Sequence, residues 1–179
     1  MNLSLALFFV FAQLAAVDGL VFHLFRYRLY AHPDSRAEHG VHTAMALGFL
    51  GVVWGMAYFR PSGVGWWTFA GWQVLTLGVS FVDVWIEPRS RARFGGLSRT
   101  EYLLHMLMNT LHGIAVAVWA GATASDRLLP NAWGHAVFAW PWPLEIVRWV
   151  TLVVAFGIPL WHLALLARPP EDCVPALTA

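Results

Sequence analysis

Long runs of apolar residues separated by short polar segments set the expected fold of this chain. Residues 1–17 carry no charge, and further apolar runs follow at 43–59, 64–82, 114–124 and 150–167. With their flanks, these runs supply five segments of the length that a helix needs to cross a bilayer core, about 20 apolar residues for about 30 Å. The pattern predicts an all-α integral membrane protein with five transmembrane helices.

Capping and helix-breaking residues indicate where these helices begin and end. Ser35 and Ser98 each stand three residues before a glutamate, which is the capping-box pattern of a helix N-terminus. Gly95 and Gly96 favour a helix stop, so Pro88 is expected to kink the third helix without ending it. The expected helices cover about residues 3–31, 35–59, 66–94, 98–124 and 144–167.

One polar pattern occurs twice and indicates a duplicated helical hairpin. In each copy an aspartate is followed by an arginine-containing turn and then by Ser-Arg-x-Glu-x-x-x-His; the copies are Asp18–His42 and Asp83–His105. We expect residues 1–60 and 61–124 to form two related hairpins, which together make a four-helix bundle. The rest of the chain is interpreted as an outer interfacial loop at 125–143, the fifth transmembrane helix at 144–168 and a cytoplasmic tail at 169–179.

Composition and charge favour the inner (cytoplasmic) membrane of a bacterium as the location. Hydrophobic residues make up 59% of the chain and charged residues 12%, against about 25% charged in soluble proteins. The lone Cys173 excludes an intrachain disulfide and implies no thiolate metal site. By the positive-inside rule, the side richer in arginine faces the cytoplasm, which places the N-terminus outside and the C-terminus in the cytoplasm. The arginines on that side are Arg26, Arg28, Arg36, Arg89, Arg91, Arg93, Arg99 and Arg168.

Ionisable residues recur inside helices that are otherwise apolar, and they are the candidate functional residues. A charged side chain at the centre of a membrane helix costs about 2.5 to 3.5 kcal/mol, so such residues usually mark ligand sites, relays or transport pathways. Several of them are carboxylates and histidines four residues apart, which share one face of a helix. The predicted metal ligands are Asp18, His23, Glu38, His42, Asp83, Glu87, Glu101, His105 and His112.

Other interpretations also fit some of these residues. Glu38 and Glu101 suit a role as helix caps alone, and the carboxylates of the third helix suit ion pairs with arginines of the following turn. Asp18 and His23 are five residues apart and about 140° around an ideal helix, so they share one ion only if the helix bulges. Asn109 suits either a donor beside the site or an interhelical hydrogen bond.

The donor set resembles that of the non-haem di-iron carboxylate proteins. In those proteins a four-helix bundle offers carboxylates from two helices and paired glutamate and histidine from two others. The resemblance covers Asp18–His112 and differs in spacing, because Glu38 and Glu101 precede their histidines by four residues and not by three. Oxygen and nitrogen donors without sulfur suit iron, manganese or zinc. The resemblance implies two divalent metal ions, with iron favoured over zinc and manganese.

We therefore expect a membrane-embedded oxidoreductase, similar to hydroxylases and desaturases, that activates oxygen on a lipid-soluble substrate within the bilayer. The sequence contains no nucleotide-binding glycine motif or cysteine cluster, so electrons are expected from a separate donor protein, and no nucleic-acid partner is indicated. A zinc-dependent lipid hydrolase with Glu38 or Asp83 as general base is the first alternative. A metal or proton transporter is the second, and a haem-binding accessory subunit using His42, His105 or His112 is the third.

Overall fold

A computed structural model describes residues 2–135 and 142–170, and in this part of the chain five helices are long and apolar enough to cross a membrane. The predicted class, an all-α protein with five candidate membrane spans, is therefore confirmed. The spans are Leu3–Arg26, Pro33–Tyr58, Val64–Phe94, Arg99–Ala122 and Glu145–Leu166.

The first span changes its helix type partway along. Helix α1 covers Asn2–Val17, and the chain then continues as a π-helix over Asp18–Arg26. The span ends there because Arg28 adopts a left-handed backbone conformation with φ of 46°, so the longer first helix expected from the sequence is wrong. Two short 3-10 turns, Leu29–Ala31 and Pro33–Ser35, lead into the next helix.

The middle three helices lie close to their expected limits. Pro88 lies inside its helix, as predicted, and the helix continues beyond it towards a glycine stop. That stop is Gly95, whose φ of 83° is a left-handed conformation that ends the helix at little steric cost. The bounds are α2 Arg36–Tyr58, α3 Val64–Arg91 with a 3-10 turn at Ala92–Phe94, and α4 Arg99–Ala122.

The two expected helix caps have different outcomes. Ser98 Oγ accepts a hydrogen bond from the Glu101 backbone N–H at 3.2 Å, so this cap is confirmed. Ser35 has a helical backbone and makes no side-chain cap; its Oγ donates to the carbonyl of Ser90 at 3.1 Å. The predicted cap at Ser35 is wrong, because this hydroxyl ties the start of α2 to the end of α3.

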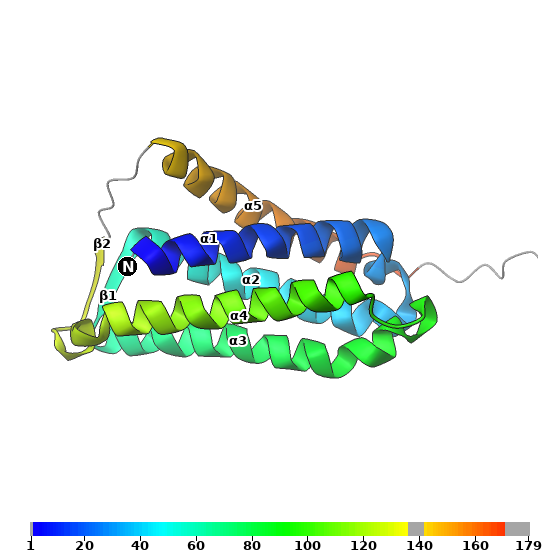
Figure 1. Cartoon of the computed structure of the whole chain (residues 1–179), viewed down its shortest axis with the longest axis horizontal. Helices are drawn as coiled ribbons and strands as arrows, with labels where there is room; N and C mark the ends of the chain where they lie inside the picture. Colours follow the sequence, from blue (N-terminus) through cyan, green and yellow to red (C-terminus); the bar gives the residue numbers. More distant parts are fainter. Residues whose placement is uncertain (1, 136–141, 171–179) are drawn as a thin grey trace, which may run out of the picture.

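The helices form a bundle with an internal gap between two helix pairs. Figure 1 shows α1 to α4 running along one axis, while α5, Trp142–Leu166, crosses them obliquely. Helix α1 packs mainly on α4, where Ser4 Oγ donates to the Ala115 carbonyl at 2.8 Å, and α2 packs on both α3 and α5. The backbones of α1 and α2 approach each other at few points, and side chains such as Phe11 and Phe49, with ring centroids 4.8 Å apart, fill part of the space between the two pairs.

Gly55 in α2 allows the close approach of α3. A Cβ atom at Gly55 would overlap the ring of Phe69, whereas a Cβ at Gly71 of α3 would meet none of the described neighbouring atoms within 4 Å. We expect Gly55→Ala to lower the free energy of unfolding by about 1 to 3 kcal/mol through overpacking. Thermal unfolding in detergent measures the effect, with Gly71→Ala as the matched control. Equal melting temperatures for the two variants would contradict this account of the α2–α3 contact.

A two-stranded antiparallel ribbon lies where the chain leaves α2 and approaches α5, and the apolar pattern does not predict it. Strand β1, Phe59–Ser62, pairs with β2, Ala132–His135. Arg60 Nε donates to Asp126 Oδ2 at 2.9 Å, in the 3-10 turn Ala124–Leu128, and this hydrogen bond raises the pKa of the guanidinium above its usual value. The ribbon therefore joins the connection between α2 and α3 to the segment that follows α4.

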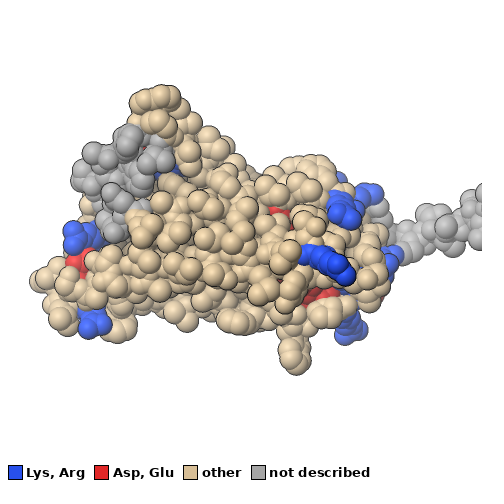
Figure 2. Space-filling model, in the orientation of Figure 1, with Lys and Arg blue, Asp and Glu red and all other residues tan. Residues whose placement is uncertain are grey.

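The surface has the distribution that a bilayer requires. Large apolar side chains, Phe81, Trp85 and Leu103 among them, are exposed along the helices, and on the face in Figure 2 the arginines lie towards the two ends. We call the end formed by the turns at 26–36 and 89–99 the basic end. Of the predicted outer loop and tail, residues 136–141 and 171–179 lie outside the described residues.

Candidate metal centre

The predicted metal ligands converge inside the bundle near the basic end. Helices α2 and α4 begin at this end, and α3 and the π-helix finish there. Each of these four elements contributes two donors close to that end. Eight of the nine predicted residues meet in one buried or nearly buried cluster, which we call the donor cluster. They are Asp18, His23, Glu38, His42, Asp83, Glu87, Glu101 and His105.

Aspartates and histidines pair reciprocally between the first two and the next two membrane spans. His105 Nε2 of α4 lies 3.1 Å from Asp18 Oδ2 of the π-helix, and His42 Nε2 of α2 lies 3.0 Å from Asp83 Oδ1 of α3. The other nitrogen of His105, Nδ1, lies 3.1 Å from Glu87 Oε1. The donor cluster is therefore held together by contacts between residues 18–42 and residues 83–105.

The π-helix brings two residues of one helix to the same point. Residues five apart point in different directions on an α-helix, but a π-helix bonds each residue to the fifth one along and so aligns them. His23 Nε2 accordingly lies 3.4 Å from Asp18 Oδ2 and 3.7 Å from Glu101 Oε1. The helix bulge that a shared ion would need is present, and the His23 ring also lies against the ring of His42, with centroids 3.9 Å apart.

Two overlapping groups of donors are compact enough to hold metal ions. Within each group one ligand atom per residue can be chosen so that all of these atoms lie within 4.8 Å of one another. His23 belongs to both groups and therefore occupies the centre of the cluster. The first group is Asp18, His23, Glu101 and His105, and the second is His23, Glu38 and His42.

Arg91 is the main residue of this site that the sequence interpretation misses. Its guanidinium is fully buried, and Nη2 lies 2.6 Å from Glu101 Oε1 and 2.9 Å from Glu38 Oε1. The ring of Tyr27 covers it, with the guanidinium carbon 4.5 Å from the ring centroid. Both glutamates thus make buried ion pairs, so a role as helix caps alone does not describe them.

A spacing signal for Arg91 is present in the sequence. Asp83, Glu87 and Arg91 are each four residues apart, so all three lie on the same stripe of α3 and face the bundle interior. The expected alternative, in which the two acidic residues of this stripe pair with arginines of the following turn, is wrong. They contact histidines of α2 and α4, and the arginine contacts the glutamates of those helices.

The charge and the unpaired atoms of the donor cluster both fit divalent cations. Five buried carboxylates and one buried guanidinium leave an excess of four negative charges when every carboxylate is ionised, and two divalent ions would balance it. Buried charge of this kind is stable only when it is paired or bound to metal. Among the described residues, three buried carboxylate oxygens of the cluster make neither a hydrogen bond nor an ion pair: Asp18 Oδ1, Glu38 Oε2 and Glu101 Oε2.

His112, the ninth predicted ligand, lies apart from the donor cluster. It is fully buried on α4, and its ring packs against Phe8, Phe11 and Phe49, with centroid distances of 5.8, 4.9 and 5.2 Å. It belongs to neither compact donor group. Its surroundings are those of a packing residue, although its spacing from His105 places both on one stripe.

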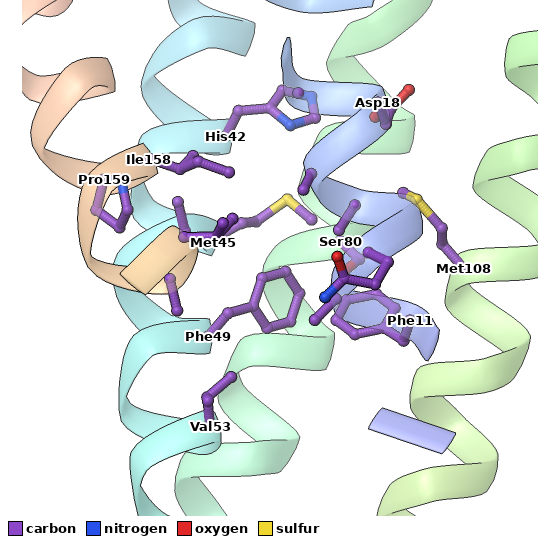
Figure 3. Close-up of a pocket in the computed structure, with 18 of the residues that line it drawn as sticks. Phe11, Asp18, His42, Met45, Phe49, Val53, Ser80, Met108, Ile158 and Pro159 are labelled. Carbon is purple, nitrogen blue, oxygen red and sulfur yellow. The ribbon is translucent and has the colours of Figure 1, made fainter. Parts of the chain in front are cut away.

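An apolar cavity of about 100 Å³ reaches the donor cluster from the middle of the bundle. Figure 3 shows His42 and Asp18 at one end of the cavity, Met45 and Phe49 farther along, and Val53 at the opposite end. Residues from all five helices line it, because α5 covers the gap between α1 and α2. An apolar molecule inside it would therefore lie next to the imidazole and carboxylate groups.

Comparison with known proteins identifies no relative: no family model matches the chain, and no curated protein or solved structure matches it. The site must therefore be interpreted from its own geometry. Three imidazoles and five carboxylates around two compact groups suit borderline or hard divalent cations.

Proposed function

We propose that this protein is a membrane-embedded, metal-dependent oxidoreductase with a dinuclear centre, most simply two iron ions, that activates oxygen on a lipid-soluble substrate. The observation that carries the proposal is the convergence of eight donors from four helices at the end of an apolar cavity. Zinc or manganese are the alternative metals for the same donors. A separate protein would supply electrons.

The pairing of the carboxylates favours oxidation over hydrolysis. A zinc hydrolase needs a spare carboxylate that can act as general base on a metal-bound water. The candidates for that role are engaged: Glu38 contacts Arg91, and Asp83 contacts His42. The cavity is lined mostly by apolar side chains, which suits a hydrocarbon more than a polar ester with attacking water.

The residues of this chain would hold and orient the centre while its metals supply the oxygen chemistry. Asp18, His23, Glu101 and His105 would hold one ion, and His23, Glu38 and His42 would hold the other. Arg91 would fix the orientation of the two glutamates and offset part of their charge. Asp83 and Glu87 would orient the histidines that they contact, the role that outer carboxylates usually have around metal-bound imidazole.

We further propose that the first four helices arose by duplication of one hairpin. The reciprocal contacts Asp18–His105 and Asp83–His42 support this, as does the pairing of Glu38 and Glu101 with one arginine. We also propose that the basic end is cytoplasmic, in a bacterial inner membrane, because of its excess of arginine.

Metal analysis of the purified protein tests the proposed function. Protein prepared in detergent without chelator is expected to contain about two metal ions per chain, mainly iron, and to show a near-ultraviolet charge-transfer band. Mass spectrometry of the metals and an absorption spectrum measure both. Strict zinc occupancy without such a band would favour the hydrolase instead.

A histidine variant outside the donor cluster provides the control. His112→Phe should keep the full metal content, because His112 contacts phenyl rings and no cluster carboxylate. Less than about one metal ion per chain in the wild-type protein, with the protein folded, would overturn the proposal. Loss of metal in His112→Phe alone would place the centre elsewhere in the bundle.

A further inference from the structure

The cavity beside the donor cluster has buried polar groups in its wall that make no hydrogen bonds. Among the described residues, both ring nitrogens of His162 and the hydroxyl of Ser80 lack a hydrogen-bond partner. The two residues are nevertheless buried, with only 2% and 5% of their surface exposed. Both residues line the cavity. An unpaired buried polar group costs about 1 to 3 kcal/mol, so a ligand that pairs with it would bind more tightly than a pure hydrocarbon.

His162 lies at the cluster end of the cavity. A Cβ atom built on Gly19 would be 3.9 Å from His162 Nε2, and Gly19 follows Asp18 of the donor cluster directly. The His162 ring also stacks on His39 of α2, with centroids 4.8 Å apart and planes 12° apart. This stacking fixes the ring without using its nitrogens, since His39 Nε2 bonds only to the backbone carbonyl of His162, at 3.2 Å.

The remainder of the cavity is apolar and narrow. Met45, Phe49 and Val53 follow one face of α2 away from the cluster, and Phe11 lies opposite them (Figure 3). A dry cavity of about 150 Å³ holds one benzene molecule, so a volume of about 100 Å³ excludes a two-chain lipid and admits a slender single chain only when the side chains that line it shift. Methionine is flexible and adapts well to such an apolar chain.

We propose that the cavity binds a single-chain amphiphile with its hydroxyl or carbonyl oxygen hydrogen-bonded to His162 and its hydrocarbon chain directed towards Phe49 and Val53. The polar end of the molecule then lies next to the metal cluster and the chain terminus lies away from it. As an assignment of the substrate, this inference rests on the proposed function. It predicts that the carbon atoms nearest the oxygen are the ones presented to the metals.

Photo-crosslinking with matched probes tests both the binding and the direction. A medium-chain alcohol with a diazirine at its chain terminus should label residues 49–53, and the same alcohol with the diazirine next to the hydroxyl should label residues 158–162. The corresponding alkane probe, which lacks the hydroxyl, should label the wild-type protein about fivefold less strongly, the loss expected for one neutral hydrogen bond. An aldehyde probe separates a carbonyl from a hydroxyl as the preferred group.

Variants of α5 provide the matched controls. His162→Phe should lower labelling by the alcohol about fivefold and leave labelling by the alkane unchanged. Ala155→Phe, which fills the cavity, should abolish labelling by both probes, whereas Ala164→Phe on the exposed side of the same helix should change neither. Equal labelling by alcohol and alkane in the wild-type protein, or a reversed pattern of labelled residues, would overturn the inference.

Metal content, measured on the same samples, separates this inference from the proposed function. If a protein that purifies without metal is labelled in the predicted direction, the proposed oxidoreductase function is disproved and the amphiphile site is supported. Full metal content without labelling in the cavity would do the opposite. The alkane probe also checks His162→Phe for folding, because a collapsed cavity would lose both labels.

Discussion

Arg91→Met is expected to destabilise the protein by about 3 to 5 kcal/mol, the usual cost of removing one partner from a buried ion pair. The change leaves Glu38 and Glu101, both fully buried, facing each other without the guanidinium that now lies 2.9 and 2.6 Å from them. Thermal unfolding in detergent and the yield of folded protein from membranes both measure the loss. A protein with marginal stability would fail to accumulate.

Two further variants make this test specific. Arg91→Lys keeps the charge, but an ammonium group lacks the planar set of donors that contacts both glutamates and stacks on the Tyr27 ring. We therefore expect an intermediate loss of stability. Arg89→Met, on an exposed neighbour of the same helix, should change the stability by no more than about 0.5 kcal/mol. If Arg91→Met melted at the wild-type temperature, the guanidinium would not be the group that holds the two glutamates.

His23→Ala is expected to remove both metal ions, whereas His105→Ala and His42→Ala should each remove one. His23 belongs to both compact donor groups, while each of the others belongs to a single group. Loss of a direct ligand should weaken metal binding by at least about tenfold, since changes in outer partners alone have effects of that size. Metal analysis of the three purified variants measures the pattern.

The His112→Phe variant described above shows whether loss of any buried histidine disturbs the bundle. Equal metal losses in His23→Ala and His105→Ala would show that His23 is not shared between the two groups. Full metal content in all three variants would disprove that the donor cluster is the metal site. Each sample also needs a measured melting temperature, because an unfolded variant loses metal for an unrelated reason.

Hydropathy and spacing are sufficient to predict the number of helices and most residues of the donor cluster. The bilayer imposes a minimum apolar length on each span, so boundaries such as those of α2 and α4 follow closely from the sequence. Charged residues inside such spans are rare enough that Glu38, His42, Asp83 and His105 stand out without a structure. Their convergence follows from simple helix geometry.

The features that sequence does not predict depend on contacts between helices. The start of the π-helix at Asp18 has no local marker, because an aspartate followed by a glycine fits many conformations. Ser35 has the sequence of a helix cap, but its hydroxyl binds the neighbouring helix at Ser90. His112 has the spacing of a ligand, yet α1 and α2 surround it with phenyl rings. In each case the partner lies far away in the chain.

The crossed pairing of Asp18 with His105 and of Asp83 with His42 has a consequence for how the protein matures. The four-donor group of Asp18, His23, Glu101 and His105 combines residues of the first span with residues of α4, so a chain that has inserted only its first two spans lacks this group. Binding of a cation by this four-donor group can only follow the packing of α4 beside the π-helix, and it would then stabilise that packing by mass action. The cation would thus stabilise correctly assembled chains selectively. Chains with incomplete helix packing would lack this stabilisation and would be degraded more readily.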